Sequence, residues 1–219
     1  ELENLLTVKK YMIDPQNIAI SGDTGSISQP LDIVRVIKIS QAISSEIVLD
    51  KLLSKLMKIL MENAGAKRGV LLLLIEDELI NIAEANLDSE AVVVQETQVN
   101  ECEDLPLTVI NYVERSRQDV VLGNAFAEDR FTTDPYVTKV KLKSVLCTPI
   151  INGDKLIGVL YLENNLTTGA FTPERLEILR LLLPQAAVSL ENAILYSSAE
   201  EKIQGLSLIH ISEPTRRDQ

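Results

Sequence analysis

The chain has 219 residues, a formal net charge of −11 and a sequence pI of about 4.7. This length supports one domain with a substantial core, and the negative charge opposes binding to nucleic acid or to an anionic membrane surface. The longest apolar run, residues 70–75, is far shorter than the roughly 20 residues of a membrane-spanning helix, so we expect a cytoplasmic protein without membrane insertion.

The first 30 residues do not have the composition of a folded domain. Residues 1–13 resemble the last turns of a helix that belongs to an upstream region. Residues 14–30 are rich in Gly, Ser, Pro and Gln and lack apolar periodicity, which predicts a flexible linker. We therefore expect a domain boundary near Pro30.

Two helices are predicted after the linker. In the first, apolar side chains mark one face: Ile33, Val36, Ile37 and Ile43. The second has apolar residues at intervals of three and four, the spacing of a stripe that covers a core, and Gly65 suits its left-handed end. The stripe consists of Leu49, Leu52, Leu53, Leu56, Met57 and Leu60.

Three strands are predicted next. Residues 69–76 form an apolar run of strand length, and residues 79–85 alternate apolar and polar side chains, so these two strands are expected to pair around residues 76–78. The Val and Thr content of residues 91–99 predicts a third strand.

The middle of the chain predicts shorter elements. A helix over residues 107–118 points three apolar side chains inward: Val109, Ile110 and Val113. A short strand follows at residues 120–122. Residues 124–140 are expected to be mostly irregular.

A β-hairpin is predicted from residues 144–151 and 156–163, joined by a tight turn at Asn152 and Gly153. The second strand has apolar residues on both faces: Ile157, Val159 and Tyr161 on one, and Leu156, Leu160 and Leu162 on the other. Such a sheet is covered on both sides. The order of helices and strands predicts an α+β domain with a central antiparallel sheet of about six strands.

A long helix is predicted from Pro173, with Thr172 as its N-cap. Its apolar residues are spaced by three and four, which predicts either a core-facing stripe or the seam of a coiled coil. The stripe is Leu176, Leu179, Leu183, Ala186, Leu190 and Ala193. Pro184 lacks an N–H for the Arg180 carbonyl, so we predict a bend between these two residues.

The second half of the chain resembles the GAF domain, a small sensory module of signalling proteins. The motifs that carry the resemblance are S-x-L-x-x-P-I, the Asn-Gly turn, L-I-G-V-L-Y-L-E-N, F-T-x-E-x-L and Q-A-A-x-x-L-E-N-A, in family order. The resemblance covers residues 31–196, and we expect a domain over residues 31–198. It is greatest with the GAF domains of multi-sensor signalling kinases that combine serine/threonine kinase and histidine kinase parts.

The resemblance implies that the first and last helices cover one face of the sheet, while a helix and irregular segments cover a ligand pocket on the other. It also implies a homodimer through the first and last helices, with Leu183, Ala186, Leu190 and Ala193 in the signalling helix. Candidate ligand-binding residues combine aromatic and polar groups, as small-ligand pockets do. They are Arg130, Phe131, Asp134, Tyr136, Ser144 and Tyr161. The alternative is that Phe131 and Tyr136 only fill space beneath the segment.

The implied function is a non-catalytic sensory domain of a signalling kinase that binds a small molecule and transmits through its flanking helices. The first alternative is a ligand-free module for dimerisation and interaction. The second is a bilin-binding photosensor, in which Cys147 would hold the chromophore. Light-sensing relatives place an aromatic residue or histidine beside that cysteine, and Cys147 has neither neighbour, so the residues argue against bilin.

Other chemistries find little support in the residues. Cyclic-nucleotide-binding GAF domains carry Asn-Lys, then Phe, then Asp-Glu; Asn164 and Phe171 match, but Asn165, Arg175 and Leu176 depart from this pattern. Two isolated cysteines, Cys102 and Cys147, indicate neither a disulfide framework nor a metal site. No nucleophile with a base is visible, so we expect no catalytic activity and can name no cofactor.

The end of the chain predicts an artefact. Residues 206–216 read LSLIHISEPTR, which resembles the translation of a transposase adapter used in sequencing libraries. We interpret residues 206–219 in this way. His210, the single histidine, would then not belong to the natural protein.

Overall fold

The computed structural model describes residues 30–44, 46, 48–87, 92–127 and 130–211. The predicted upstream helix end (1–13), all but the last residue of the predicted linker, and residues 212–219 of the predicted adapter translation lie outside these described residues. Residues 34–219 form one compact unit, and the fold below is that of this unit.

Five helices and six strands appear in the described residues, with one short 3₁₀ turn. The helices are α1 (Pro30–Ser44), α2 (Leu49–Ala64), α3 (Leu107–Ser116), α4 (Pro135–Val140) and α5 (Pro173–Ile211). The strands are β1 (Arg68–Ile75), β2 (Glu78–Asn86), β3 (Val92–Gln98), β4 (Val120–Leu122), β5 (Ser144–Asn152) and β6 (Lys155–Asn164). The 3₁₀ turn, η2 (Val99–Glu101), follows β3.

The six strands form one antiparallel sheet in the order β3-β2-β1-β6-β5-β4. Strands β1 and β6, which are far apart in the sequence, therefore lie side by side in the centre of the sheet. The predicted α+β class and six-stranded antiparallel sheet are confirmed.

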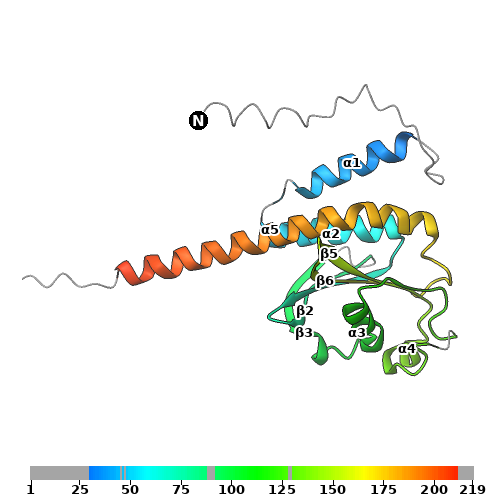
Figure 1. The fold of residues 1–219 in the computed structure, drawn as a ribbon. Coiled ribbons are helices and arrows are strands. Elements are labelled where there is room, and N and C mark those ends of the chain that lie inside the picture. Colours follow the sequence, from blue (N-terminus) through cyan, green and yellow to red (C-terminus); the bar gives the residue numbers. More distant parts are fainter. Residues whose placement is uncertain (1–29, 45, 47, 88–91, 128–129, 212–219) are drawn as a thin grey trace, which may run out of the picture. The chain divides into compact units, whose positions relative to one another are not determined.

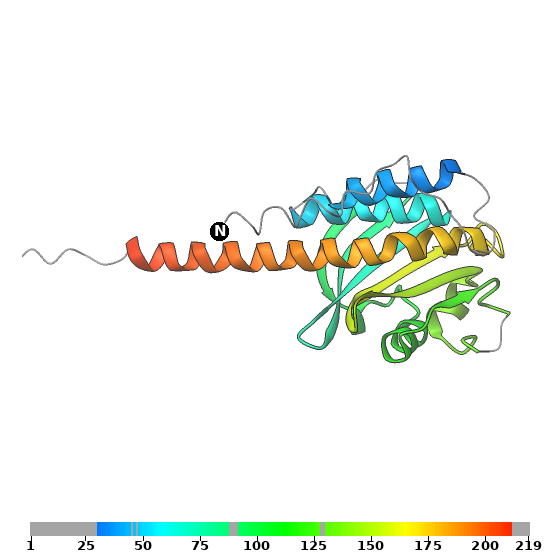
Figure 2. The ribbon, with the colours of Figure 1, turned by 45° about the horizontal axis from the view of Figure 1, so that its top comes forward.

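Helices cover both faces of the sheet, as its two apolar faces require. On one face α2 and α5 lie side by side (Figures 1 and 2), and their apolar stripes bury a core that includes Leu56, Leu60, Leu183 and Leu190. On the other face α3 and α4 bury a second core with the connecting segments. We call these the α2–α5 core and the α3–α4 core.

The first helix departs from its predicted face. Ile43 is buried and Val36 and Ile39 pack against the α2–α5 core, but Ile37 is 48% exposed. Ile37 is rotated by about 100° from Val36 around the helix axis, which places it outside the contact that Val36, Ile39 and Ile43 make with this core. The predicted place of Ile37 on the buried face is wrong.

The β5–β6 turn lies one residue later than predicted. Asn152 pairs with Lys155, which leaves Gly153 and Asp154 as the two-residue loop, and only Gly153 has a positive φ, of 60°. A single positive φ at the first loop position is the pattern that places glycine there in a type II′ hairpin. Asn152 therefore belongs to strand β5.

The β1–β2 turn places two acidic residues in the left-handed region. Glu76 and Asp77 have φ values of 51° and 66°, between the paired residues Ile75 and Glu78. This conformation is costly for residues with a Cβ, and glycine adopts it without that cost.

Substituting Asp77→Gly is therefore expected to raise the free energy of unfolding by about 0.5–1 kcal/mol. Urea denaturation of the two proteins measures the difference. Gly153→Ala is the matched reverse change in the other hairpin, and it should lower stability. Equal or lower stability of Asp77→Gly would contradict the strained turn.

Helix α4 was not predicted, because residues 124–140 were expected to be mostly irregular. Asp134 caps the helix by accepting hydrogen bonds from the backbone N–H groups of Tyr136 (2.9 Å) and Val137 (3.3 Å), and Pro135 occupies the first helical position. Both features are favourable at helix starts. The short helix fixes Tyr136 and Val137 against the sheet.

Helix α5 is continuous, with Pro184 inside it. The bend predicted between Arg180 and Pro184 stays a prediction. Pro184 and Arg180 lie on the exposed side, where water can bond the carbonyl that lacks a helical partner. Leu182, Leu183 and Ala186 are buried on the opposite side and hold the helix against the domain.

Helix α5 is also long and apolar enough, over Pro173–Ala199, to cross a membrane by length and composition alone. In the unit described here 44% of its most apolar window is buried, and its apolar stripe lies in the α2–α5 core. This is the environment of a core helix in a folded domain.

Candidate functional site

The six side chains predicted to bind a ligand lie beneath and around α4, but five of them are buried in contacts within the chain. Asp134 is 1% exposed and binds two helices at once. In addition to the α4 N–H groups, it accepts hydrogen bonds from the backbone N–H (3.0 Å) and hydroxyl (2.7 Å) of Thr108 in α3. Its carboxylate therefore joins the starts of α3 and α4.

Ser144 lies apart from the other candidates and fastens the segment between β6 and α5. Its hydroxyl donates to the Thr167 carbonyl (2.9 Å) and accepts from the Ala170 N–H (3.0 Å). The residue is fully buried. Its hydrogen bonds thus shape the entry of α5.

Tyr136 and Tyr161 meet at a carboxylate that the sequence reading did not select, Glu163 of β6. The Tyr161 hydroxyl donates to Glu163 Oε2 at 2.6 Å, and the Tyr136 hydroxyl lies 3.0 Å from the same oxygen. All three residues are at least 93% buried. Two phenols and one carboxylate thus share a single buried point on the sheet.

Arg68 of β1 completes this buried cluster. Its guanidinium donates to Glu84 Oε1 (2.7 Å), to the Tyr136 hydroxyl (3.0 Å) and to the Asp104 carbonyl (2.9 Å). One of its nitrogens lies 3.7 Å from Glu163 Oε2, and Arg68 and Glu163 are directly opposite each other on β1 and β6. We call Arg68, Glu84, Tyr136, Tyr161 and Glu163 the Arg68 cluster.

Burial and neighbouring charges shift the pKa values of three members of the Arg68 cluster: Arg68, Tyr136 and Tyr161. Burial, and next the Glu163 charge, raise the pKa values of both Tyr136 and Tyr161. Burial lowers the pKa of Arg68, but the hydrogen bond to Glu84 and the Glu163 charge outweigh it and leave that pKa raised. The phenols therefore stay neutral donors and Arg68 stays a cation.

Arg130 and Phe131 both contact the ring of Tyr112 in α3, apart from the Arg68 cluster. The exposed Arg130 guanidinium lies 4.0 Å from the Tyr112 ring centre, and the Phe131 ring meets that of Tyr112 edge-on, with centres 6.0 Å apart. Phe131 itself is buried in the α3–α4 core. This arrangement stabilises the α3 side of the domain through cation–π and aromatic contacts.

The candidates thus make different contacts within the described part of the chain. Tyr136 and Tyr161 come together at Glu163, Asp134 lies two residues from Tyr136, and Ser144, Arg130 and Phe131 serve other contacts. Sequence reasoning missed Arg68, Glu84 and Glu163. A signal was present: Glu163 is a charged residue at the end of an apolar strand. Such a residue requires a partner when it is buried.

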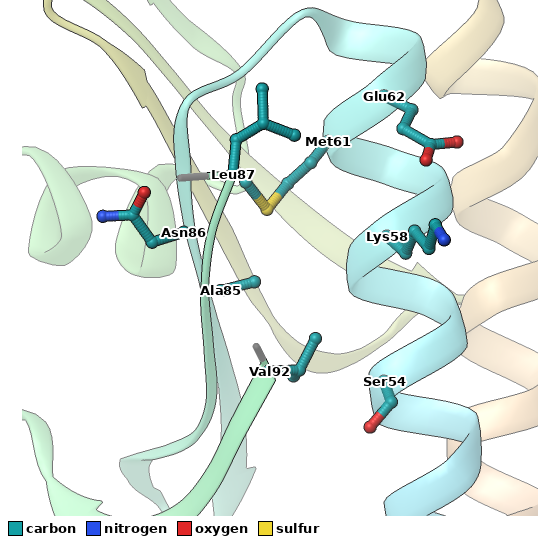
Figure 3. Close-up of a pocket in the computed structure, with 8 residues that line it drawn as sticks. All are labelled: Ser54, Lys58, Met61, Glu62, Ala85, Asn86, Leu87 and Val92. Carbon is teal, nitrogen blue, oxygen red and sulfur yellow. The ribbon is translucent and has the colours of Figure 1, made fainter. Parts of the chain in front are cut away.

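A cleft of about 450 Å³ lies on the opposite face, between α2 and the β2–β3 edge of the sheet (Figure 3). Met61, Ala85 and Val92 point into the gap between helix and strands, whereas Asn86 points away from it. Ser54, Lys58, Glu62 and Leu87 complete the lining. Its volume is within the range of small-molecule sites.

Neither cysteine forms a disulfide within the described residues, and Cys147 is completely buried in the α3–α4 core. Burial, and next the charge of Asp119, raise the pKa of the Cys147 thiol. A buried neutral thiol is a poor nucleophile and a poor attachment point. Within the part of the chain that the structure describes, no three His, Cys, Asp or Glu residues are grouped to hold a metal ion.

The predicted signalling residues of α5 are buried within a single chain. Leu183, Ala186, Leu190 and Ala193 are at most 7% exposed and belong to the α2–α5 core, which is the core-facing alternative for this stripe. Among the described residues of α5, four large apolar side chains are exposed: Leu181 by 49%, Val188 by 39%, Leu195 by 63% and Tyr196 by 57%. Leu181, Val188 and Leu195 repeat every seven residues, and we call these three the outer stripe.

Together, the antiparallel sheet, the paired helices α2 and α5 and the covered opposite face define a small α+β domain with helices on both sides of its sheet. The GAF domain family matches residues 48–190, more than half of the 219 residues. The chain belongs to the GAF domain family.

Relatives of known function share this domain. Hybrid signal transduction histidine kinase G of Dictyostelium discoideum is 29% identical to this chain over 265 residues, which covers 76% of the chain and 8% of the kinase. The chain thus spans less than a tenth of that relative's length.

Solved structures share the fold. The GAF domain of Acinetobacter phosphoenolpyruvate-protein phosphotransferase has a TM-score of 0.58 and 20% identity, with 76% of this chain and 96% of that one covered. The GAF domain of a two-component sensor histidine kinase from Bacillus halodurans has a TM-score of 0.52 and 23% identity, with 69% and 99% covered.

Proposed function

We propose that this chain is a non-catalytic regulatory domain of a cytoplasmic signalling kinase, and that it works by self-association and transmission along α5. The outer stripe is the observation that carries the proposal. Leu181, Val188 and Leu195 are large apolar side chains on the exposed side of a helix whose other side is fixed to the core. A repeat of seven residues is the spacing at which helices pair in a coiled coil.

The relationship to a hybrid histidine kinase supports the proposal. Helix α5 continues past Ala193, the last buried residue of its stripe, through residues 194–205 without a break, which suits it to carry a change of rotation or separation to a downstream element. The absence of activity is part of the proposal, because Cys147 is buried and its thiol stays protonated.

Binding of a small molecule beneath α4, the mechanism first inferred from the sequence, has less support. Asp134, Tyr136 and Tyr161 already bond to groups of the same chain, so a ligand would have to break these contacts. The interaction module, the alternative from the sequence, agrees better with this geometry.

The test is the oligomeric state of the chain by sedimentation equilibrium. A dimer is expected, and the triple substitution Leu181→Glu, Val188→Glu and Leu195→Glu should raise its dissociation constant by at least about thirtyfold. Leu166→Glu is the matched control, because Leu166 is 71% exposed in a loop outside α5. A monomer, or a dimer that survives the triple substitution, would contradict the proposal.

A further inference from the structure

The cleft between α2 and the β2–β3 edge has an apolar floor and a polar rim. Met61 and Ala85 are at most 5% exposed, and Val92 packs against the same α2–α5 core. Their side chains point into the cleft in Figure 3. Water reaches the apolar lining mainly at Leu87, which is 43% exposed, and at the half-buried Val92, and a ligand with an apolar body would remove this surface from water.

The rim offers groups that bind an anion. Lys58 and Ser54 lie one helical turn apart on the outward side of α2, and both line the cleft. Within the described residues, the Lys58 ammonium has no ion-pair partner and the Ser54 hydroxyl has no hydrogen bond. An ammonium and a hydroxyl at this spacing can donate together to one carboxylate.

We infer that the cleft binds a small monocarboxylate with an aliphatic body, such as a medium-chain fatty acid. Its carboxylate lies at Lys58 and Ser54, and its chain covers Met61, Ala85 and Val92. Glu62 lies one turn beyond Lys58 on the same rim. The negative charge of Glu62 repels a second ligand carboxylate near it, so the site favours a monoacid over a diacid of equal length.

The position of the cleft connects it to α5. Met61 belongs to the core that also buries Leu183 and Leu190, and α2 packs directly against α5. A ligand on Met61 therefore contacts the helix that holds α5 in place. Binding of the ligand does not require the self-association proposed above. The binding experiment and the measurement of oligomeric state can therefore fail independently of each other.

Isothermal titration calorimetry with octanoate, below its micelle concentration, tests the site on the full chain. We expect saturable binding, weakened about fivefold by Lys58→Gln. Ser54→Phe should abolish it, because the exposed ring can fill the cleft without disturbing the core. Lys51→Gln is the matched control, since it removes the same charge from α2 two turns away, outside the cleft lining.

Octanol and octanedioate test recognition of the head group, and both should bind more weakly than octanoate. Thermal unfolding of each variant reports whether it is folded. The inference is overturned by absence of octanoate binding to the folded wild-type chain, by equal losses in Lys58→Gln and Lys51→Gln, by undiminished binding in folded Ser54→Phe, or by octanedioate binding as well as octanoate.

Discussion

Replacing Asp134 with alanine is expected to lower the free energy of unfolding by about 3 kcal/mol, because this one carboxylate accepts four hydrogen bonds while 1% exposed. The substitution removes the acceptor of the buried Tyr136 N–H group and of the part-buried Thr108 N–H group. Loss of a helix cap alone costs about 1 kcal/mol, and the bonds to Thr108 add the remainder. Guanidinium denaturation with an unchanged m-value measures the effect.

Two further variants serve as comparisons for Asp134→Ala. Asp134→Asn keeps one acceptor oxygen and should have intermediate stability. Asp154→Ala removes an exposed aspartate side chain from the β5–β6 turn and should change stability little. A loss below about 1 kcal/mol in Asp134→Ala would mean that the carboxylate only caps α4.

Replacing Arg68 with methionine is expected to cost about 3–5 kcal/mol, because it leaves the Glu163 carboxylate buried without its cation. The side chains of Arg68 and Glu163 are 14% and 8% exposed, so water cannot replace the lost charge well. The double variant Arg68→Met with Glu163→Gln removes both charges and should recover part of this loss. A double-mutant cycle in denaturant yields the coupling energy.

The exposed ion pair between Lys155 and Glu191 is the control for the Arg68 cycle. Its N···O distance is 2.7 Å, shorter than the 3.7 Å between Arg68 and Glu163, yet the Lys155 side chain is 69% exposed. Solvent screens such a pair, so Lys155→Met should hardly change stability. If Arg68→Met behaves like Lys155→Met, the Arg68 cluster does not hold α4 to the sheet.

Local signals predicted most of the fold. The three- and four-residue spacing of α2, the left-handed Gly65 and the apolar alternation of β2 each depend on neighbours in the sequence, and the structure has all three. The β5–β6 hairpin was also predicted, with its turn displaced by one residue. The missed helix α4 is six residues long, too short for periodicity, although the Asp134-Pro135 start was visible.

The Arg68 cluster could not be predicted in the same way. Arg68 and Glu163 are opposite each other because β6 returns to the centre of the sheet beside β1, and that pairing is set by the whole topology. Tyr136 and Tyr161 were selected for their aromatic rings, but their partners determine what they do. In the sequence, the apolar stripe of α5 was compatible with a core-facing surface and with a coiled-coil seam. Only the packing of α5 in the structure shows that this stripe faces the core.

Because its buried apolar stripe packs in the α2–α5 core, α5 leaves the domain in a fixed rotational orientation about its own axis. Each residue added downstream rotates whatever follows by about 100°, while seven residues nearly restore the original orientation. Under the transmission proposed above, the domain would set the orientation of an element joined to the end of α5. A junction of altered length would change the direction in which that element faces, with no change in the domain itself.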